Sequence, residues 1–337
     1  MKKAFLAANS PHGALKKISV LGLGVSGIAA ANLAVKLGYE VFASDSGAWR
    51  KVLNLNKKVV TEFGGHSGAV LNANFIIKSP GITNDIPIIK KAKKSGIPVI
   101  SELDFALARC NPQKVIAVTG TNGKTTVTDL SEKIIASYFK NSAAAGNIGT
   151  PLSELVSKNK IKKNSVLTLE TSSYQLEDSP GFKPDISILL NITEDHLDHH
   201  KSMRAYIKAK AGIFKNQTKN DCLICNYDDK ICRGLAKKAK CKVIYFSRRK
   251  KCGVYYENGS IFFPNGKSIT PKINIAGIHN IENILAAAAA AYVCGVLLKN
   301  IERAISKYKG IAHRIEFVKE TGGVKYYNDS KATNVGS

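Results

Sequence analysis

The sequence predicts an α/β protein with a Rossmann-like N-terminal domain, a central P-loop-type ATPase domain with a mostly parallel sheet, and the start of a third α/β domain. Two observations carry this prediction. Two glycine-rich turns each follow an apolar strand and precede a helical pattern, and similar strand and helix patterns alternate through both halves. The break at Asn111-Pro112 separates the two turns. We therefore expect domains at 1–111, 112–310 and 311–337.

Composition excludes several classes of protein. A chain of 337 residues is long enough for about two to three domains, and 44% hydrophobic residues can fill their cores, which excludes a disordered or fibrous chain. The net charge is +25, with lysine-rich clusters at 90–94, 158–163 and 248–251. These clusters are not interleaved with aromatic residues or set in a nucleic-acid-reading motif. The charge therefore favours binding of polyanionic small molecules, with no nucleic acid.

Membrane insertion and secretion are not expected. The N-terminal residues 1–13 contain too short an apolar run for a signal peptide, and the apolar run 286–293 is typical of a core helix. The seven cysteines are scattered and odd in number, which favours free thiols in a reducing cytoplasm. Cys222 and Cys225 form a CxxC spacing inside a strand-like run, and we expect them to be core residues.

The first glycine-rich turn lies in KISVLGLGVSG, residues 17–27. It contains Gly22-x-Gly24-x-x-Gly27, and the next strand, 39–43, leads to Asp45, as in dinucleotide-binding folds. Alone, this fingerprint favours an NAD-dependent oxidoreductase. A UDP-sugar, however, also has a phosphate and a ribose that can bind at a helix N-terminus beside a carboxylate. In addition, no catalytic acid or base suited to hydride transfer accompanies the turn. The fingerprint indicates a nucleotide and leaves its identity open.

Further strands at 75–78 and 97–100 each end in a small or polar residue, where open parallel sheets bind ligands. The second glycine-rich turn follows strand 115–118. It differs from the common P-loop pattern because Val118 stands five residues before Gly123. A helix beginning near Thr125 directs its positive end at the turn. We expect this loop to bind ATP phosphates through Gly120, Thr121, Asn122, Gly123, Lys124, Thr125 and Thr126.

Two later strands each deliver a possible metal ligand. Strand 166–170 ends in Glu170, and strand 186–190 leads to His196. Together with Thr125 they predict a Mg²⁺–phosphate site assembled from three loops. Taken singly, Glu170 could instead cap a helix, and His196 could be a structural histidine in a polar turn.

Several motifs together resemble those of one enzyme family. GTNGKTT, GNIG, ETSSYQLE and TEDHLDHH occur in that order, followed by YIKAKAGIF, GIHNIENILAA, HRIEFV and NDSKATN. This series resembles the Mur ligases of peptidoglycan synthesis, from Leu21 onward, and SSYQLE favours the branch that adds D-glutamate. Folate-polyglutamating enzymes share the P-loop and the His-Asn segment but have little counterpart to residues 22–45.

The resemblance implies a role for each matching residue. Lys124 would bind phosphate, Thr125 and Glu170 the first Mg²⁺, and His196 a second Mg²⁺, beside Lys210 as a carbamate. The alternative for Lys210, from the sequence alone, is an ordinary helix-surface lysine. Further implied positions are Val25, Ser26, Asp45 and Ser46 for the uridine diphosphate, Asn147 near substrate and metals, Asn280, Asn283, Arg314 and Asp329 for ATP, and Lys331 and Thr333 for the acyl substrate or incoming amino acid.

The implied reaction is a two-step ligation in the bacterial cytoplasm. ATP phosphorylates the carboxylate of UDP-N-acetylmuramoyl-L-alanine, and the amine of D-glutamate attacks the acyl phosphate. Metals and Lys124 would neutralise charge while the loops align the reactants. No protein nucleophile is expected, and we expect a monomer.

The C-terminal end departs from the family pattern. Family members continue with a third domain of roughly a hundred residues, an ordinary domain size, whereas this sequence ends at Ser337. We therefore expect an incomplete copy of the ligase with a loosely packed tail after Ile311. The alternatives are a UDP-sugar-binding fragment without turnover and a Mur ligase that adds a different amino acid.

Overall fold

The computed structural model describes residues 16–49, 51–147 and 149–332. The expectations for the N-terminal residues 1–13, for Ile148 in the GNIG turn and for Thr333 lie outside these ranges.

Within the described residues, the first sheet has five parallel strands in the order β3-β2-β1-β4-β5. The strands are β1 (Lys17–Leu21), β2 (Glu40–Asp45), β3 (Val60–Phe63), β4 (Phe75–Lys78) and β5 (Val99–Ser101), with helices α2 (Val25–Lys36), η1 (Gly68–Leu71), α3 (Pro87–Lys94) and α4 (Glu102–Leu107). The chain adds β2 and β3 on one side of β1 and then β4 and β5 on the other side, so the strand order reverses between β1 and β4. This reversal is typical of Rossmann-type folds, and the predicted fold class is confirmed.

The second sheet, counted over the described residues, has nine strands in the order β14-β13-β12-β11-β10-β9-β6-β8-β7. Strands from β7 to β12 pair in parallel, while β13 and β14 add an antiparallel edge that was not predicted. The strands are β6 (Lys114–Thr119), β7 (Ser142–Gly146), β8 (Val166–Glu170), β9 (Ile186–Leu189), β10 (Cys222–Asn226), β11 (Lys242–Ser247), β12 (Val254–Glu257), β13 (Ser260–Phe262) and β14 (Ser268–Ile269).

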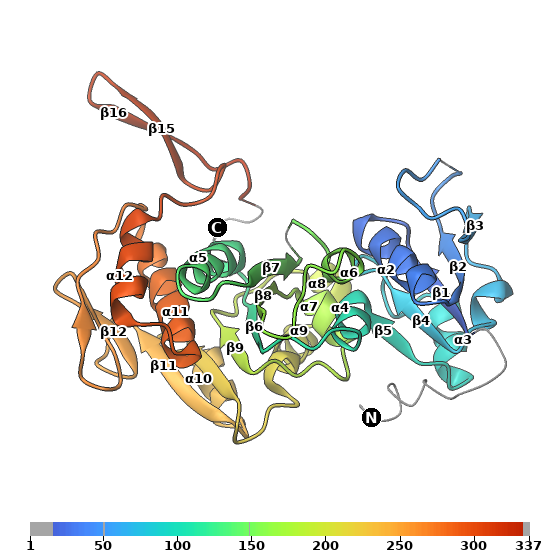
Figure 1. The fold of residues 1–337 in the computed structure, drawn as a ribbon, viewed down its shortest axis with the longest axis horizontal. Coiled ribbons are helices and arrows are strands. Elements are labelled where there is room, and N and C mark those ends of the chain that lie inside the picture. The colour runs from blue at the N-terminus through green and yellow to red at the C-terminus, as the bar shows by residue number, and fades with distance from the viewer. Residues whose placement is uncertain (1–15, 50, 148, 333–337) are drawn as a thin grey trace.

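Helices cover both faces of the second sheet (Figure 1). They are α5 (Lys124–Ala136), α6 (Leu152–Ser157), α7 (Ser173–Glu177), α8 (Leu197–His200), α9 (Met203–Ala211), η2 (Gly212–Phe214), α10 (Lys230–Ala236), α11 (Ile278–Cys294) and α12 (Leu298–Lys307). The alanine run 286–291 of α11 is fully buried, which confirms the predicted core helix, and small side chains let the helix lie close to the strands. No helix in the described ranges combines the length and hydropathy needed to span a bilayer.

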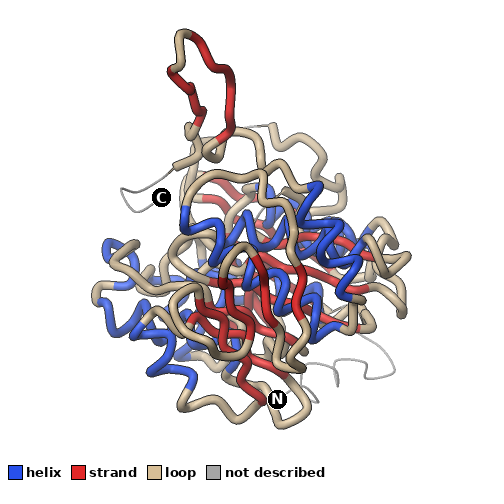
Figure 2. Tube along the Cα trace, turned by 90° about the vertical axis from the view of Figure 1, so that its left-hand side faces the viewer, coloured by secondary structure: helices blue, strands red, loops and turns tan. Residues whose placement is uncertain are grey.

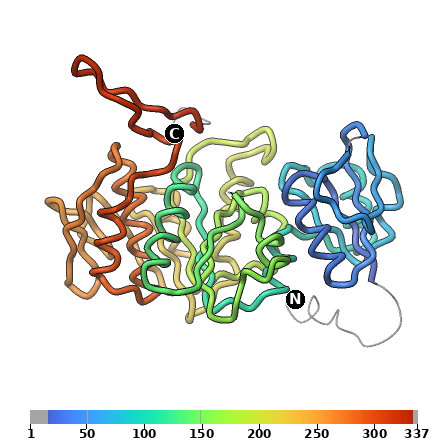
Figure 3. The backbone as a smooth tube through the Cα atoms, turned by 45° about the horizontal axis from the view of Figure 1, so that its top comes forward, coloured from blue at the N-terminus to red at the C-terminus, as the bar shows by residue number. Residues whose placement is uncertain are grey.

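Among the described residues, one buried hydrophobic cluster spans both sheets. Leu103 and Phe105 of α4, behind the first sheet, belong to the same buried cluster as Leu152 and Phe182 behind the second. A buried ion pair also joins the two parts: Lys78 Nζ on β4 lies 2.7 Å from a carboxylate oxygen of Asp178, just after α7. Apolar and ionic contacts thus join the two parts, which lie next to each other in Figure 3.

The last described strands form a separate hairpin. Strands β15 (Glu316–Thr321) and β16 (Val324–Asn328) pair with each other alone among the described strands. Most of their side chains are exposed, and the hairpin projects away from the two large sheets (Figure 2). The segment between α12 and β15 nevertheless returns to the second sheet, where it reaches the site described next.

Candidate active site at the carboxyl ends of the second sheet

A cavity of about 360 Å³ lies above β6, between the P-loop, α11 and the segment before β15. Strand β6 stands between β8 and β9 at the centre of the sheet, where the strand order places ligand crevices. The cavity brings together many residues predicted from separate motifs. Those lining it are Thr121, Asn122, Gly123, Lys124, Thr125, Thr126, Asn147, Glu170, His196, Lys210, Asn280, Asn283, Arg314 and Asp329.

Close packing fixes the P-loop. Gly123 has φ +84°, and a Cβ there would lie 2.3 Å from Asn283 Oδ1 on α11. A Cβ on Gly120 would lie 2.8 Å from Leu190 Cβ. The Asn122 amide donates a hydrogen bond to the Asn191 side chain at 2.8 Å. Glycine is therefore required at both positions for the loop to pass between β9 and α11.

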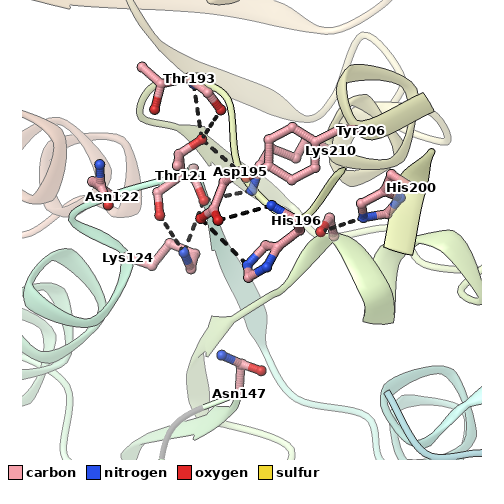
Figure 4. A network of polar contacts seen from close by, with 12 residues as sticks. Thr121, Asn122, Lys124, Asn147, Thr193, Asp195, His196, His200, Tyr206 and Lys210 are labelled. Carbon is pink, nitrogen blue, oxygen red and sulfur yellow. Dashed lines mark hydrogen bonds and ion pairs between the residues drawn. The ribbon is translucent and has the colours of Figure 1, made fainter. Parts of the chain in front are cut away.

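Lys124 turns back onto its own loop. Its ammonium donates to the carbonyl oxygens of Gly120, at 3.0 Å, and Thr121, at 2.7 Å (Figure 4). Burial lowers the pKa of Lys124, while the carboxylates of Glu170 and Asp195 act in the opposite direction. The side chain is thus held at the cavity wall as a preplaced cationic partner for an anion.

Glu170 has the chemistry of a metal ligand. It is 2% exposed, and its Oε1 accepts a hydrogen bond from the Asn147 amide at 3.0 Å. Its Oε2 is buried without a hydrogen-bond partner among the described residues. A buried carboxylate oxygen left unpaired is costly, and a bound cation would satisfy it. Because Glu170 faces a phosphate-type loop, the arrangement fits Mg²⁺.

Lys210 is buried, whereas a helix-surface lysine would be exposed. It is 1% exposed, donates to the Gly120 carbonyl oxygen at 2.6 Å, and lies 4.6 Å from the centre of the Tyr206 ring. Burial, and then the nearby Lys124 charge, hold the pKa of Lys210 well below its usual 10.5. The amine therefore has a larger neutral fraction, the form able to act as a nucleophile.

His196 occupies a left-handed position, φ +53°, immediately before α8. Its backbone amide donates to Asp195 Oδ1 at 2.9 Å, and its Nε2 lies 3.6 Å from Asp195 Oδ2. Burial lowers the pKa of His196, which favours the neutral imidazole that metals bind. Figure 4 shows its ring near Lys124 and Lys210, whose charges also act on it.

The segments on either side of the β15–β16 hairpin also line the cavity, although they lie far along the chain from the P-loop. Arg314 Nη2 donates to the Thr125 hydroxyl oxygen at 3.2 Å, and Asp329 Oδ1 accepts from the Ile315 amide. Lys331, by contrast, is exposed and does not line the cavity. Its backbone amide donates to the His313 carbonyl oxygen at 3.1 Å.

The N-terminal glycine-rich turn forms a second, separate candidate site on the first sheet. Asp45 ends β2, and its two carboxylate oxygens accept from the amides of Leu23, at 2.7 Å, and Gly47, at 2.9 Å. Val25 is 69% exposed, and a Cβ on Gly24 would meet open space. Ser46 is exposed and Ser26 partly exposed. Hydrogen bonds to Asp45 thus fix the conformation of the turn, and its outer surface at Gly24 and Val25 is accessible to a ligand.

Sequence reasoning missed several residues that line the cavity. Asn226 is the last residue of β10, as Glu170 is of β8, so the rule that located Glu170 also applies to it. Asn226 donates to Glu282 on α11, whose other carboxylate oxygen accepts from Arg248 at 2.6 Å. No local pattern in the sequence brings α11 to this strand end. Asn191 and Tyr174 also line the cavity.

Family models and sequence relatives that match this chain are Mur ligases. The family described as "Mur ligase middle domain" matches residues 118–291, and "Mur ligase MurD-like, N-terminal domain" matches residues 16–101. The UDP-N-acetylmuramoylalanine–D-glutamate ligase of Elusimicrobium minutum is 42% identical over 333 residues, covering 96% of this chain and 73% of the relative. The enzyme of the same name from Clostridioides difficile is 40% identical, covering 95% and 73%.

Solved structures agree on the fold. A murein peptide ligase from Psychrobacter arcticus aligns with TM-score 0.62 at 22% identity, covering 93% of this chain and 72% of that one. The UDP-N-acetylmuramate–alanine ligase MurC from Thermotoga maritima aligns with TM-score 0.56 at 20% identity, covering 93% and 74%. At these identities the likeness concerns the fold.

Proposed function

This chain belongs to the Mur ligase family, and we propose that its two glycine-rich turns bind the two nucleotide substrates of a D-glutamate-adding ligase. The activity is ATP-dependent addition of D-glutamate to UDP-N-acetylmuramoyl-L-alanine in peptidoglycan synthesis. The turn at 22–27, in a domain at 1–111, takes the UDP moiety. The P-loop at 120–126, in a domain at 112–310, takes ATP.

The observation that carries this proposal is the unpaired, buried Glu170 Oε2 beside Lys124 in the P-loop cavity. Glu170 and the Thr125 hydroxyl would hold one Mg²⁺, and His196 with Lys210 a second. When bound, the ions neutralise negative charge on the transferring phosphoryl group. Lys124 binds phosphate oxygens, and Asn280 and Asn283 on α11 contact the nucleotide.

Lys210 fits a metal site after one covalent change. Its neutral amine attacks the carbon of CO₂, an N–C bond forms, and the amine loses one proton to solvent. The cation becomes a carbamate anion, which attracts the metal that the ammonium would repel. Burial and the Lys124 charge, which lower the pKa of Lys210, favour the neutral amine that this step needs.

The three substrates react in two steps. The carboxylate of UDP-N-acetylmuramoyl-L-alanine attacks the γ-phosphorus of ATP, ADP leaves, and an acyl phosphate forms. The amine of D-glutamate then attacks the acyl carbon, a C–N bond forms, the C–O bond to phosphate breaks, and the nitrogen loses one proton to the departing phosphate or to solvent. The described residues bind and align the phosphates, and none acts as a covalent nucleophile.

A reciprocal pair of variants tests the assignment of substrates. Gly24→Val places a side chain in open space at the first turn, so the fold should persist while UDP-substrate affinity falls at least tenfold. Lys124→Met should weaken binding of a non-hydrolysable ATP analogue instead. Isothermal titration calorimetry measures both ligands on both variants. Loss of ATP binding in Gly24→Val would show that the substrates are assigned to the wrong turns.

Turnover tests the reaction itself. Phosphate release that requires D-glutamate supports the ligase, and Glu170→Gln should abolish it while leaving UDP-substrate affinity nearly unchanged. Release with a different amino acid in place of D-glutamate would indicate another branch of the family. Binding of both nucleotides without phosphate release would favour the alternative, a nucleotide-binding protein without turnover.

A further inference from the structure

A second group of metal-ligand side chains lies beside the cavity, on α7 and α8. Glu177 ends α7, and His199 and His200 end α8. One carboxylate oxygen of Glu177 and one ring nitrogen of each histidine all lie within 4.8 Å of one another. Figure 4 shows His200 beyond His196, on the side away from Lys124. The ligase chemistry described above uses none of the three residues.

The spacing of the ligand atoms is close to what a tetrahedral ion needs. With metal–nitrogen bonds of about 2.0–2.1 Å, neighbouring ligand atoms lie about 3.3 Å apart. His199 Nε2 already lies 3.1 Å from Glu177 Oε2. The remaining separations exceed this spacing by about 1.5 Å at most. A rotamer change of the exposed Glu177 adjusts the distance from its carboxylate to His200, and small rotations of the two rings adjust the distance between the histidines.

The surrounding residues fix the two rings in place. His200 is buried, and its Nε2 lies 2.9 Å from the Ser173 hydroxyl oxygen. The Tyr174 ring stacks on His200 with centres 5.5 Å apart and meets His199 edge-on at 4.3 Å. Rings held this way lose little freedom when a metal binds, which favours affinity.

The donor set selects the class of metal. Two imidazoles and one carboxylate suit zinc, cobalt or nickel, whereas Mg²⁺ prefers oxygen ligands. Glu177 is exposed, so the fourth position is open to water. In a chain of net charge +25, this corner also contains the acidic Asp198, in the first turn of α8.

We propose that Glu177, His199 and His200 bind one zinc-class transition-metal ion at a site distinct from the magnesium site at Glu170. The ion would join α7, which follows Glu170 on β8, to α8, which follows His196. It would therefore hold the two metal-bearing loops of the cavity at a fixed spacing. The proposal goes beyond the ligase function and does not require it, because binding alone tests it.

The test is a titration of the chain with Co²⁺ in excess Mg²⁺ and without nucleotide, read from the visible absorption of tetrahedral cobalt and reversed by Zn²⁺. We expect one equivalent to bind. His199→Arg should lower the affinity at least tenfold, because a guanidinium keeps the pairing with Glu177 but has no lone pair for a metal. Glu177→Gln, which removes the anionic ligand at constant size, should also lower it at least tenfold.

Two variants serve as matched controls. His313 lies near Glu316, with Nδ1 3.8 Å from its carboxylate, and forms a similar exposed pair without a second histidine. His313→Gln and His196→Ala should both retain the cobalt affinity. Zn²⁺ should raise the thermal midpoint of the parent and of His313→Gln, but not of His199→Arg, whose midpoint without metal should match the parent.

Three results would overturn the proposal. Unchanged cobalt affinity in both His199→Arg and Glu177→Gln would show that these residues do not bind the metal and that the histidine–glutamate pair is only structural. Loss of the signal in His196→Ala would place the ion at the catalytic site. A near-ultraviolet thiolate-to-cobalt band would place it on cysteine instead.

Discussion

Replacing Lys78 with methionine should destabilise the protein by about 3–5 kcal/mol, the usual cost of breaking a buried ion pair. The Lys78 side chain is 0% exposed, and its ammonium lies 2.7 Å from a carboxylate oxygen of Asp178, which is 6% exposed. Methionine has a similar length, so the change removes charge while keeping most of the volume. The buried carboxylate of Asp178 would then have the neutral side-chain amide of Asn84, 2.9 Å away, as a partner but no longer a cation.

Urea denaturation followed by circular dichroism measures the loss. The control is Lys158→Met, because Lys158 forms an exposed pair with Glu154 at 2.6 Å and should change stability by under about 0.5 kcal/mol. Adding Asp178→Leu to Lys78→Met should recover most of the loss, since no unpaired buried charge remains. A loss below about 1 kcal/mol in Lys78→Met, or a double variant as unstable as the summed single variants, would refute this reasoning.

Three further predictions concern single positions. Burial raises the pKa of Glu102 above its usual 4.5, so its contribution to stability is complete below that pH and is lost as pH rises through the folded-state pKa. Glu102→Gln should therefore be more stable than the parent at pH 8, with the difference disappearing near pH 4 in urea titrations; a difference that grows on acidification contradicts this. Gly123→Ala should weaken ATP-analogue binding at least tenfold by calorimetry, because the position has φ +84° and its Cβ would lie 2.3 Å from Asn283 Oδ1, and unchanged affinity would refute the packing argument. Lys210→Arg should lose the carbamate ¹³C resonance seen with labelled bicarbonate, together with turnover; a parent protein without that resonance would remove the carbamate from the proposal.

The elements that the sequence predicted well are those specified locally. Strands 75–78 and 166–170 match β4 and β8, because a short apolar run bounded by polar residues identifies a buried parallel strand. The P-loop and its helix were predicted for the same reason, since their glycines and lysine lie within six residues.

What the sequence did not predict depends on contacts between distant segments. Lys78 and Asp178 are one hundred positions apart, and no periodic pattern links them. A place for Lys210 beside the metals followed only from the family resemblance, and its burial was not predicted, because a lysine in a helix usually faces water. His199 and Glu177 lie on different helices, α8 and α7, which both pack against α9, so their pairing becomes visible only in the folded chain.

The shared core has a practical consequence for dividing this protein. The break at Asn111-Pro112 is clear in the sequence, yet Leu103 and Phe105 on one side of it belong to the same buried cluster as Leu152 and Phe182 on the other. A fragment cut there would expose a contiguous apolar face on each half, the kind of surface that drives aggregation during expression. Residues 16–310 should therefore fold cooperatively, and a cleaner first fragment would need those apolar positions replaced by polar ones.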